Sequence, residues 1–180
     1  GDWDITAGGA FDDVWNSDLH IVPRFQVPGS WRICRSMDWG SSHPFSVGWW
    51  AISNGEEVVL SGNKTISFPK DSLIRIAELY GADVVNGEQF GHNKGRKLSA
   101  RKLAQEVLEV EEELTMLGWI KTKPEPGPAD NQIYNVSEDE SGSIASMMEN
   151  EGVEWTRSDK KAGSRANGFQ IMRDMMERST

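Results

Sequence analysis

The stretch Arg35–Trp50, "RSMDWGSSHPFSVGWW", decides the fold that this sequence predicts. It reads as the end of one β-strand, a turn at Gly40 and a second strand that is rich in tryptophan. Asp38 ends the first strand, in the most apolar region of the chain. A buried, ionised carboxylate is costly unless it is paired or bound to a metal ion. We therefore expect the rest of the sequence to supply a partner for Asp38.

The segments around this stretch predict antiparallel strands. In "WRICRSMD" (31–38), Trp31, Ile33, Arg35 and Met37 alternate with Arg32, Cys34, Ser36 and Asp38, which is typical of a strand. "FSVGWWAIS" (45–53) and "EEVVLSG" (56–62) follow, joined by the hairpin signal Asn54-Gly55, and "KTISF" (64–68) makes a third pass. The segment "SLIRIAELYG" (72–81) fits either a strand or a short helix, and both alternatives stay open.

The second half of the chain predicts helices that alternate with short strands. "LSARKLAQEVLEVEEELTMLG" (98–118) has one apolar stripe, a candidate N-cap at Ser99 and a closing Gly118. We expect its many glutamates to form a solvated face. "SGSIASMMENEG" (141–152) and "SRANGFQIMRDMMERS" (164–179) predict two more helices, with a short strand between them. This order predicts a mixed α/β fold, a mixed sheet flanked by helices.

The length of 180 residues allows one domain, or one domain with an arm. Prolines, glycines and scattered aromatics without a period predict an arm or interdomain linker over residues 1–30, followed by a domain over 31–180. No apolar run approaches the ~20 residues that span a membrane, and no phosphate-cradling glycine motif is present. Because the chain starts at Gly1, we expect it to be part of a longer protein.

The net charge of −9 argues against a nucleic-acid partner, but the charge is unevenly distributed. Basic residues cluster in the segments 92–102, 121–123 and 157–165. Local basic loops can still contact DNA, with weak and strongly salt-dependent affinity. The single cysteine, Cys34, excludes an internal disulfide and a cysteine-based zinc site.

Asp130 is the second candidate carboxylate, delivered by the stiff segment "PGPAD" (126–130). On local features alone, Asp38 and Asp130 could each cap a turn through the neighbouring backbone. Brought together at one end of a sheet, they would repel each other unless a divalent cation lay between them. Mg²⁺ and Mn²⁺ prefer such oxygen ligands, and two ions about 4 Å apart can drive phosphodiester hydrolysis. Weaker candidates are Glu78, Glu138, Asp139 and Glu140.

Several blocks of this sequence resemble the large terminase subunit of tailed bacteriophages and prophages, in its C-terminal nuclease domain. The blocks are "GDWDITAGGAFDDVW" (1–15), "WRICRSMDWGSSHPFSVGWWAISNG" (31–55), "IAELYG" (76–81), "GPAD" (127–130) and "KKAGSRANGFQIMRDMM" (160–176). The resemblance implies a ribonuclease H-like fold, whose central mixed sheet has three antiparallel first strands. It implies a metal-dependent endonuclease that cuts concatemeric viral DNA through two Mg²⁺ or Mn²⁺ ions.

The same resemblance implies which residues hold the metal. The family's first acid corresponds to Asp38 and its second to Asp130, with Glu78 in reserve. Its third acid comes from a later helix, which we expect to lie beyond Thr180, so the domain is expected to be truncated at its C-terminus. An alternative function is therefore a catalytically incomplete module that binds DNA or docks on the packaging motor and portal.

The partners implied are double-stranded viral DNA, the small terminase subunit, the portal protein and an ATPase domain N-terminal to Gly1. The implied location is the host bacterial cytoplasm, with a transient visit to the procapsid portal. Basic residues in "DKKAGSR" become candidate DNA-backbone contacts, and a second basic group is a weaker candidate; a solvated surface is the alternative for both. The first group is Lys160, Lys161 and Arg165, and the second is Lys94, Arg96 and Lys97.

Overall fold

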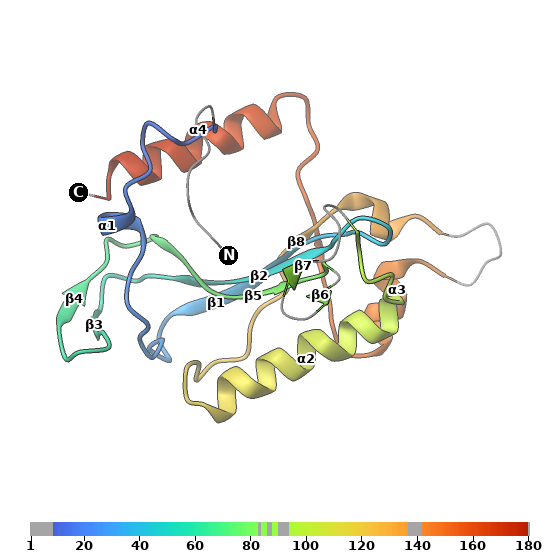
Figure 1. Ribbon diagram of the computed structural model, residues 1–180, viewed down its shortest axis with the longest axis horizontal. Coiled ribbons are helices and arrows are strands. Elements are labelled where there is room, and N and C mark those ends of the chain that lie inside the picture. The colour runs from blue at the N-terminus through green and yellow to red at the C-terminus, as the bar shows by residue number, and fades with distance from the viewer. Residues whose placement is uncertain (1–8, 83, 86–87, 90–93, 137–141, 180) are drawn as a thin grey trace. The chain divides into compact units, whose positions relative to one another are not determined.

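A computed structural model of the chain describes residues 9–82, 84–85, 88–89, 94–136 and 142–179 (Figure 1). The chain forms two compact units. The larger unit is Phe25–Ser158, and the smaller one combines Gly1–Arg24 with Asp159–Thr180. The predicted domain boundary at residue 30 stays a prediction. None of the helices in the described ranges is long and apolar enough to cross a membrane.

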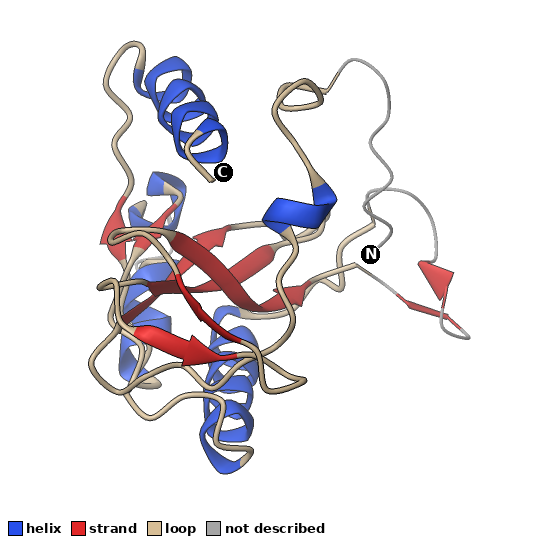
Figure 2. Cartoon of the chain, turned by 90° about the vertical axis from the view of Figure 1, so that its left-hand side faces the viewer, coloured by secondary structure: helices blue, strands red, loops and turns tan. Residues whose placement is uncertain are grey.

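The larger unit is built on a mixed β-sheet, whose strands are red in Figure 2. This sheet has five strands in the order β5-β2-β1-β8-β9. Strand β2 is antiparallel to both β1 and β5, whereas β8 and β9 run parallel to β1. The prediction of a mixed sheet with three antiparallel first strands is therefore confirmed. The strands are β1 Arg32–Asp38, β2 Ser46–Ile52, β5 Leu73–Tyr80, β8 Pro128–Ala129 and β9 Thr156–Arg157.

The identity of the third antiparallel strand differs from the prediction. The segment left open between strand and helix is β5, which pairs with β2 along the whole strand. Segments β3 (Glu57–Val59) and β4 (Thr65–Ser67) pair only with each other. The reason lies at the end of β2, where the backbone of Ser53 is hydrogen-bonded to residues 71 and 72, just before β5. Two short strands, β6 (Val84–Val85) and β7 (Glu88–Gln89), form another small sheet.

Helices α2 (Ala100–Met116) and α3 (Ile144–Asn150) cover one face of the five-stranded sheet (Figure 1). The Ser99 hydroxyl accepts a hydrogen bond from the Lys102 N–H, which confirms the predicted N-cap of α2. Ser143 and Ser146 form a capping box at the start of α3. The apolar stripe of α2 is buried against the sheet through Leu103, Ala104, Val107 and Leu114, next to Phe45, Val47 and Trp49.

A buried ion pair crosses this interface. Arg35 of β1 donates from Nη1 to Glu111 Oε1 of α2 at 2.5 Å, and their side chains are only 2% and 8% exposed. Trp49 Nε1 donates to the same carboxylate oxygen at 3.0 Å, and Arg35 Nη2 donates to the Glu154 carbonyl at 3.2 Å. The prediction that the glutamates of this helix are all solvated is therefore wrong for Glu111. Its burial is tolerated because two donors satisfy the charge.

The smaller unit joins the N-terminal segment to the last helix, α4 (Ser164–Glu177). The Arg173 guanidinium donates to both carboxylate oxygens of Asp13, and this hydrogen bonding lowers the pKa of Asp13. The rings of Phe11 and Phe169 lie 5.6 Å apart between their centroids. The short helix α1 (Ser17–His20) completes this unit.

Breaking the buried pair should strongly destabilise the larger unit. Because Arg35→Met leaves the Glu111 carboxylate buried without its cation, we expect it to lower the free energy of unfolding by about 3–5 kcal/mol. The double variant Arg35→Met/Glu111→Leu should lose less than the sum of the two single variants. Urea unfolding monitored by tryptophan fluorescence measures both effects.

The exposed pair Arg32–Glu125 supplies a matched control on the same strand. Its atoms Nη2 and Oε2 lie 2.7 Å apart, but the side chains are 68% and 48% exposed. We expect Arg32→Met to cost less than about 1 kcal/mol. An equal cost for Arg32→Met and Arg35→Met would show that burial does not control the strength of these pairs.

Candidate metal centre

The two candidate aspartates lie at the carboxyl ends of neighbouring parallel strands. Met37 of β1 is paired with Ala129 of β8, and the Asp130 N–H donates to the Met37 carbonyl at 3.2 Å. Asp38 and Asp130 each follow one residue after this pair. Because parallel neighbours in register lie about 4.8 Å apart, Asp38 and Asp130 occupy adjacent backbone positions at the same edge of the sheet.

Asp38 is not buried, so the expectation of a buried carboxylate is wrong. The buried charge in this strand is Arg35, which shares its face with Met37 against α2, whereas Asp38 is exposed. Within the described ranges the Asp38 side chain makes no hydrogen bond or ion pair, and it does not cap the turn at Ser41 and Ser42. The case for a metal therefore rests on the pairing of Asp38 with Asp130, not on burial.

The predicted turn after Asp38 depends on Gly40. A Cβ atom at this position would overlap the backbone carbonyl oxygens of His43 and Pro44. The glycine is required by this close approach of the chain to itself, because any side chain would push the loop outward. Gly40 thus keeps the loop after Asp38 folded back on itself.

Asp130 is half-buried and acts as a cap, as one of the open alternatives predicted. It precedes the short 3₁₀-helix η1 (Asn131–Tyr134), and its Oδ1 accepts the Gln132 N–H at 3.1 Å. An ionised carboxylate has about four lone-pair sites, so capping does not exclude metal binding by the same group. Asp130 can therefore serve both roles at once.

The sequence did not indicate that three other side chains lie around Asp130. Gln132 Nε2 donates to the Trp39 carbonyl at 3.4 Å, and Asn131 Nδ2 donates to the Ser158 carbonyl at 3.1 Å. Tyr134 packs in the same turn; burial raises the pKa of its phenol. The sequence "ADNQIY" could have indicated the cap at Asp130, but the reach to Trp39 and Ser158 depends on the strand order.

Glu78 lies on the same face of the sheet as Asp38 but two strands away. It is paired with Gly48 of β2, and its Oε1 accepts from the Ser46 hydroxyl at 3.5 Å and from Arg75 Nη1 at 3.3 Å. Two strand spacings correspond to about 10 Å. Asp38 and Asp130 therefore follow adjacent strand positions, whereas Glu78 lies two strands from Asp38 and is paired with Arg75.

The donor set of Asp38 and Asp130 fits a hard divalent cation. Mg²⁺ is commonly held by one or two carboxylates, with waters or substrate phosphates as the remaining ligands. In the described part of the chain, no three histidine, cysteine or acidic residues are grouped closely enough to hold a metal. The weaker candidates Glu138, Asp139 and Glu140 lie outside the described residues.

The first group of predicted DNA-contacting residues belongs to the smaller unit, whereas both aspartates and the weaker group belong to the larger one. Lys160, Lys161 and Arg165 are all exposed, in the loop and first turn that begin α4. Of the weaker group, Arg96 forms a bidentate ion pair with Glu106, at 2.8 Å for both contacts. This pairing reduces the charge that Arg96 can offer to a phosphate.

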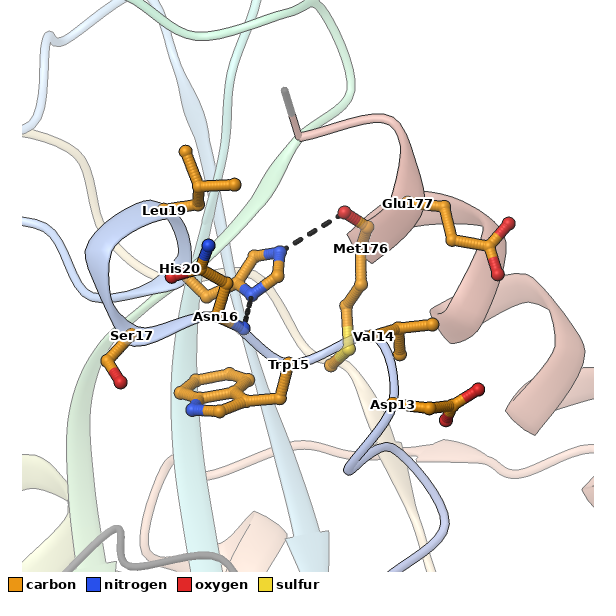
Figure 3. Close-up of a pocket in the computed structure, with 9 residues that line it drawn as sticks. All are labelled: Asp13, Val14, Trp15, Asn16, Ser17, Leu19, His20, Met176 and Glu177. Atoms are coloured by element: carbon orange, nitrogen blue, oxygen red, sulfur yellow. Dashed lines mark hydrogen bonds between the residues drawn. The ribbon is translucent and has the colours of Figure 1, made fainter.

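A shallow pocket in the smaller unit contains none of the predicted site residues (Figure 3). His20 lies at its centre, where its Nδ1 accepts the Asn16 N–H at 2.9 Å and its Nε2 lies 3.1 Å from the Met176 carbonyl. With Nδ1 as the acceptor, Nε2 is the ring nitrogen that can donate to this carbonyl. The pocket is lined by Asp13, Val14, Trp15, Asn16, Ser17, Leu19, His20, Met176 and Glu177.

Neither a protein-family model nor a curated protein sequence matches this chain. Solved structures do resemble it. The large terminase from a thermophilic bacteriophage, in complex with ADP, aligns at 13% identity and a TM-score of 0.57 over 94% of this chain and 32% of that one. Another structure of the same large terminase aligns at 14% identity and a TM-score of 0.54, over 93% and 32%. The P22 large terminase nuclease domain aligns at 12% identity and a TM-score of 0.52, over 96% and 70%.

These likenesses establish the fold. The chain has the ribonuclease H-like fold of the phage terminase nuclease domains, which confirms the predicted fold class. It spans about a third of the thermophilic phage's large terminase, at 32% of the length of that chain.

The capping role of Asp130 can be separated from its charge. Asp130→Ala removes the acceptor of the Gln132 N–H, so we expect the free energy of unfolding to fall by about 1 kcal/mol. Asp130→Asn keeps an acceptor at Oδ1 and should change it by less than about 0.5 kcal/mol, because Asn and Asp cap equally well. Urea unfolding of the two variants without added metal measures the difference. Equal stabilities would show that the cap contributes nothing.

Proposed function

We propose that this chain is the nuclease domain of a phage large terminase, a metal-dependent endonuclease that cuts concatemeric viral DNA during packaging. The observation that carries the proposal is the pairing of Asp38 with Asp130 at the carboxyl ends of adjacent parallel strands. A ribonuclease H-like fold shared with the P22 large terminase nuclease domain supports it.

Asp38 and Asp130 would hold Mg²⁺ or Mn²⁺, and Glu78 stays in reserve as an alternative second acid. When bound, such ions activate a water and stabilise the leaving oxygen of a phosphodiester. Asp38 contributes an exposed carboxylate that substrate can approach. Asp130 contributes a carboxylate whose orientation is fixed by its hydrogen bond with the Gln132 N–H.

The proposed substrate is double-stranded viral DNA, contacted by Lys160, Lys161 and Arg165, with Lys94, Arg96 and Lys97 as a weaker second group. The proposed partners are an ATPase domain of the same polypeptide, the small terminase subunit and the portal protein. The proposed location is the host bacterial cytoplasm. The thermophilic phage's large terminase that this chain resembles was crystallised with ADP, which agrees with a nucleotide-binding domain elsewhere in such proteins.

A second candidate function is a non-catalytic module that binds DNA or docks on the motor and portal. It is favoured by the two-residue donor set, since no third metal ligand joins Asp38 and Asp130 in the described ranges. The two functions differ in whether a metal ion and a DNA cut depend on the aspartates.

Plasmid cleavage distinguishes the two functions. Supercoiled plasmid is incubated with the chain in Mn²⁺ or Mg²⁺, beside Asp38→Asn and Asp130→Asn. Because losing a metal ligand removes several kcal/mol of transition-state stabilisation, we expect each variant to cut at least about 10²-fold more slowly. Nicked and linear products on a gel measure the rate.

Glu57→Gln is the matched control, because Glu57 is an exposed acid on β3, outside the five-stranded sheet. It should cut at the wild-type rate. Intact plasmid with every metal, in this chain and in one extended beyond Thr180, would contradict the nuclease proposal and favour the docking module. Undiminished cutting by Asp38→Asn would overturn the site assignment.

A further inference from the structure

Two consecutive amide side chains connect Asp130 to both neighbouring strands. Asn131 Nδ2 donates to the carbonyl of Ser158, the residue directly after β9. Gln132 Nε2 donates to the carbonyl of Trp39, the residue directly after Asp38 and β1. Strand β8 lies between β1 and β9, so the two side chains reach in opposite directions from the same turn.

The Asn131 side chain replaces a backbone hydrogen-bond donor at the point where the parallel ladder ends. The Asp130 N–H donates to Met37, and the Ser158 N–H donates to Ala129, both at 3.2 Å. In a continuing ladder, the next bond to the Ser158 carbonyl would come from the N–H of residue 131. The chain instead turns into η1, and the Asn131 side chain supplies the donor at 3.1 Å. The sheet can therefore end directly after Asp130 without leaving that carbonyl unpaired.

Gln132 is hydrogen-bonded both to Asp130 and to Trp39, the residue that follows Asp38. Its backbone N–H donates to Asp130 Oδ1 at 3.1 Å, and its side chain donates to the Trp39 carbonyl at 3.4 Å. One residue thus fixes the orientation of the second carboxylate and also holds the loop that follows the first. Because β8 itself has only two residues, this bridge adds to the backbone hydrogen bond between the Asp130 N–H and the Met37 carbonyl.

We propose that Asn131 and Gln132 form an amide clamp that sets the geometry of Asp38 and Asp130 for metal binding. This inference rests on the proposed function, in that a divalent cation is bound by the two aspartates. The clamp residues are positioning residues, since each acts through a backbone carbonyl or through Asp130. Residues that orient metal ligands in this way typically change metal affinity by 10–100-fold when they are replaced.

The experiment measures Mn²⁺ binding to the 180-residue chain by calorimetry, in wild type, Asp38→Asn, Gln132→Met and Asn131→Leu. Methionine and leucine match the replaced side chains in size but donate no hydrogen bond. Gln132 is exposed, so its replacement leaves the core intact. The control is Asn135→Met, which replaces another exposed amide at the end of η1. Melting temperatures without metal accompany each measurement.

We expect Gln132→Met and Asn131→Leu to raise the dissociation constant for Mn²⁺ by at least about 10-fold. Gln132→Met should keep the wild-type melting temperature, and its plasmid cleavage should recover at saturating Mn²⁺. An unchanged melting temperature without metal would separate this loss of affinity from a purely structural defect. Asn135→Met should bind like wild type.

The outcomes separate the clamp from the function on which it rests. If wild type binds no Mn²⁺, or Asp38→Asn binds it equally well, the proposed metal site fails, and the clamp fails with it. If wild type binds and Asp38→Asn does not, the site stands. An affinity of Gln132→Met within twofold of wild type, or a loss no larger than that of Asn135→Met, would then overturn the clamp alone.

Discussion

The buried ion pair between Arg35 and Glu111 is the constraint on which the rest of the structure depends. It joins the central strand β1 to helix α2, and the Trp49 indole completes the coordination of the carboxylate. A side-chain period of two means that a slip of one residue in β1 would expose Arg35 and turn Asp38 into the core. The first change would leave the buried Glu111 carboxylate without its cation. The second would place the Asp38 carboxylate among apolar side chains. The pair therefore selects one register, and this register places Asp38 on the open face.

The same residue also organises the approach of β8. A Cβ atom at Gly127 would overlap the backbone carbonyl oxygen of Arg35, so only glycine lets the chain come this close to β1. Two residues later the chain is in register, with Ala129 beside Met37. The side chain of Arg35 thus anchors the helix layer, while its backbone receives the strand that carries Asp130. The packing of the helix layer and the position of the candidate site therefore both depend on Arg35.

Local patterns in the sequence predicted most of the helices and strands. They could not predict which strands pair with each other or which side chains meet across the fold. The alternation over residues 31–38 correctly placed Arg35 with the apolar side chains. The exposure of Asp38 follows from the same alternation, although the apolar surroundings suggested burial. Asn54-Gly55 is a valid turn signal, but it could not show that β5 rather than β3 pairs with β2, because that choice is made by residues some twenty positions away. Glu111 looked like its neighbours in a run of glutamates. Glu111 is buried because it pairs with Arg35, which lies on a strand, so the periodicity of the helix alone could not predict its burial.

The shortness of β8 has a consequence for how the sheet holds together. With two residues, this strand contributes few hydrogen bonds to the ladder, and in the five-stranded sheet β9 is hydrogen-bonded to β8 alone. Such a junction opens locally at a lower free energy than the long β1–β2–β5 ribbon. A cation shared by Asp38 and Asp130 would act there as a cross-link, contributing stability that grows with the logarithm of its concentration. Occupancy by metal and closure of the sheet edge would then be one equilibrium, in which slow amide exchange at Asp130 and Ser158 reports the bound state.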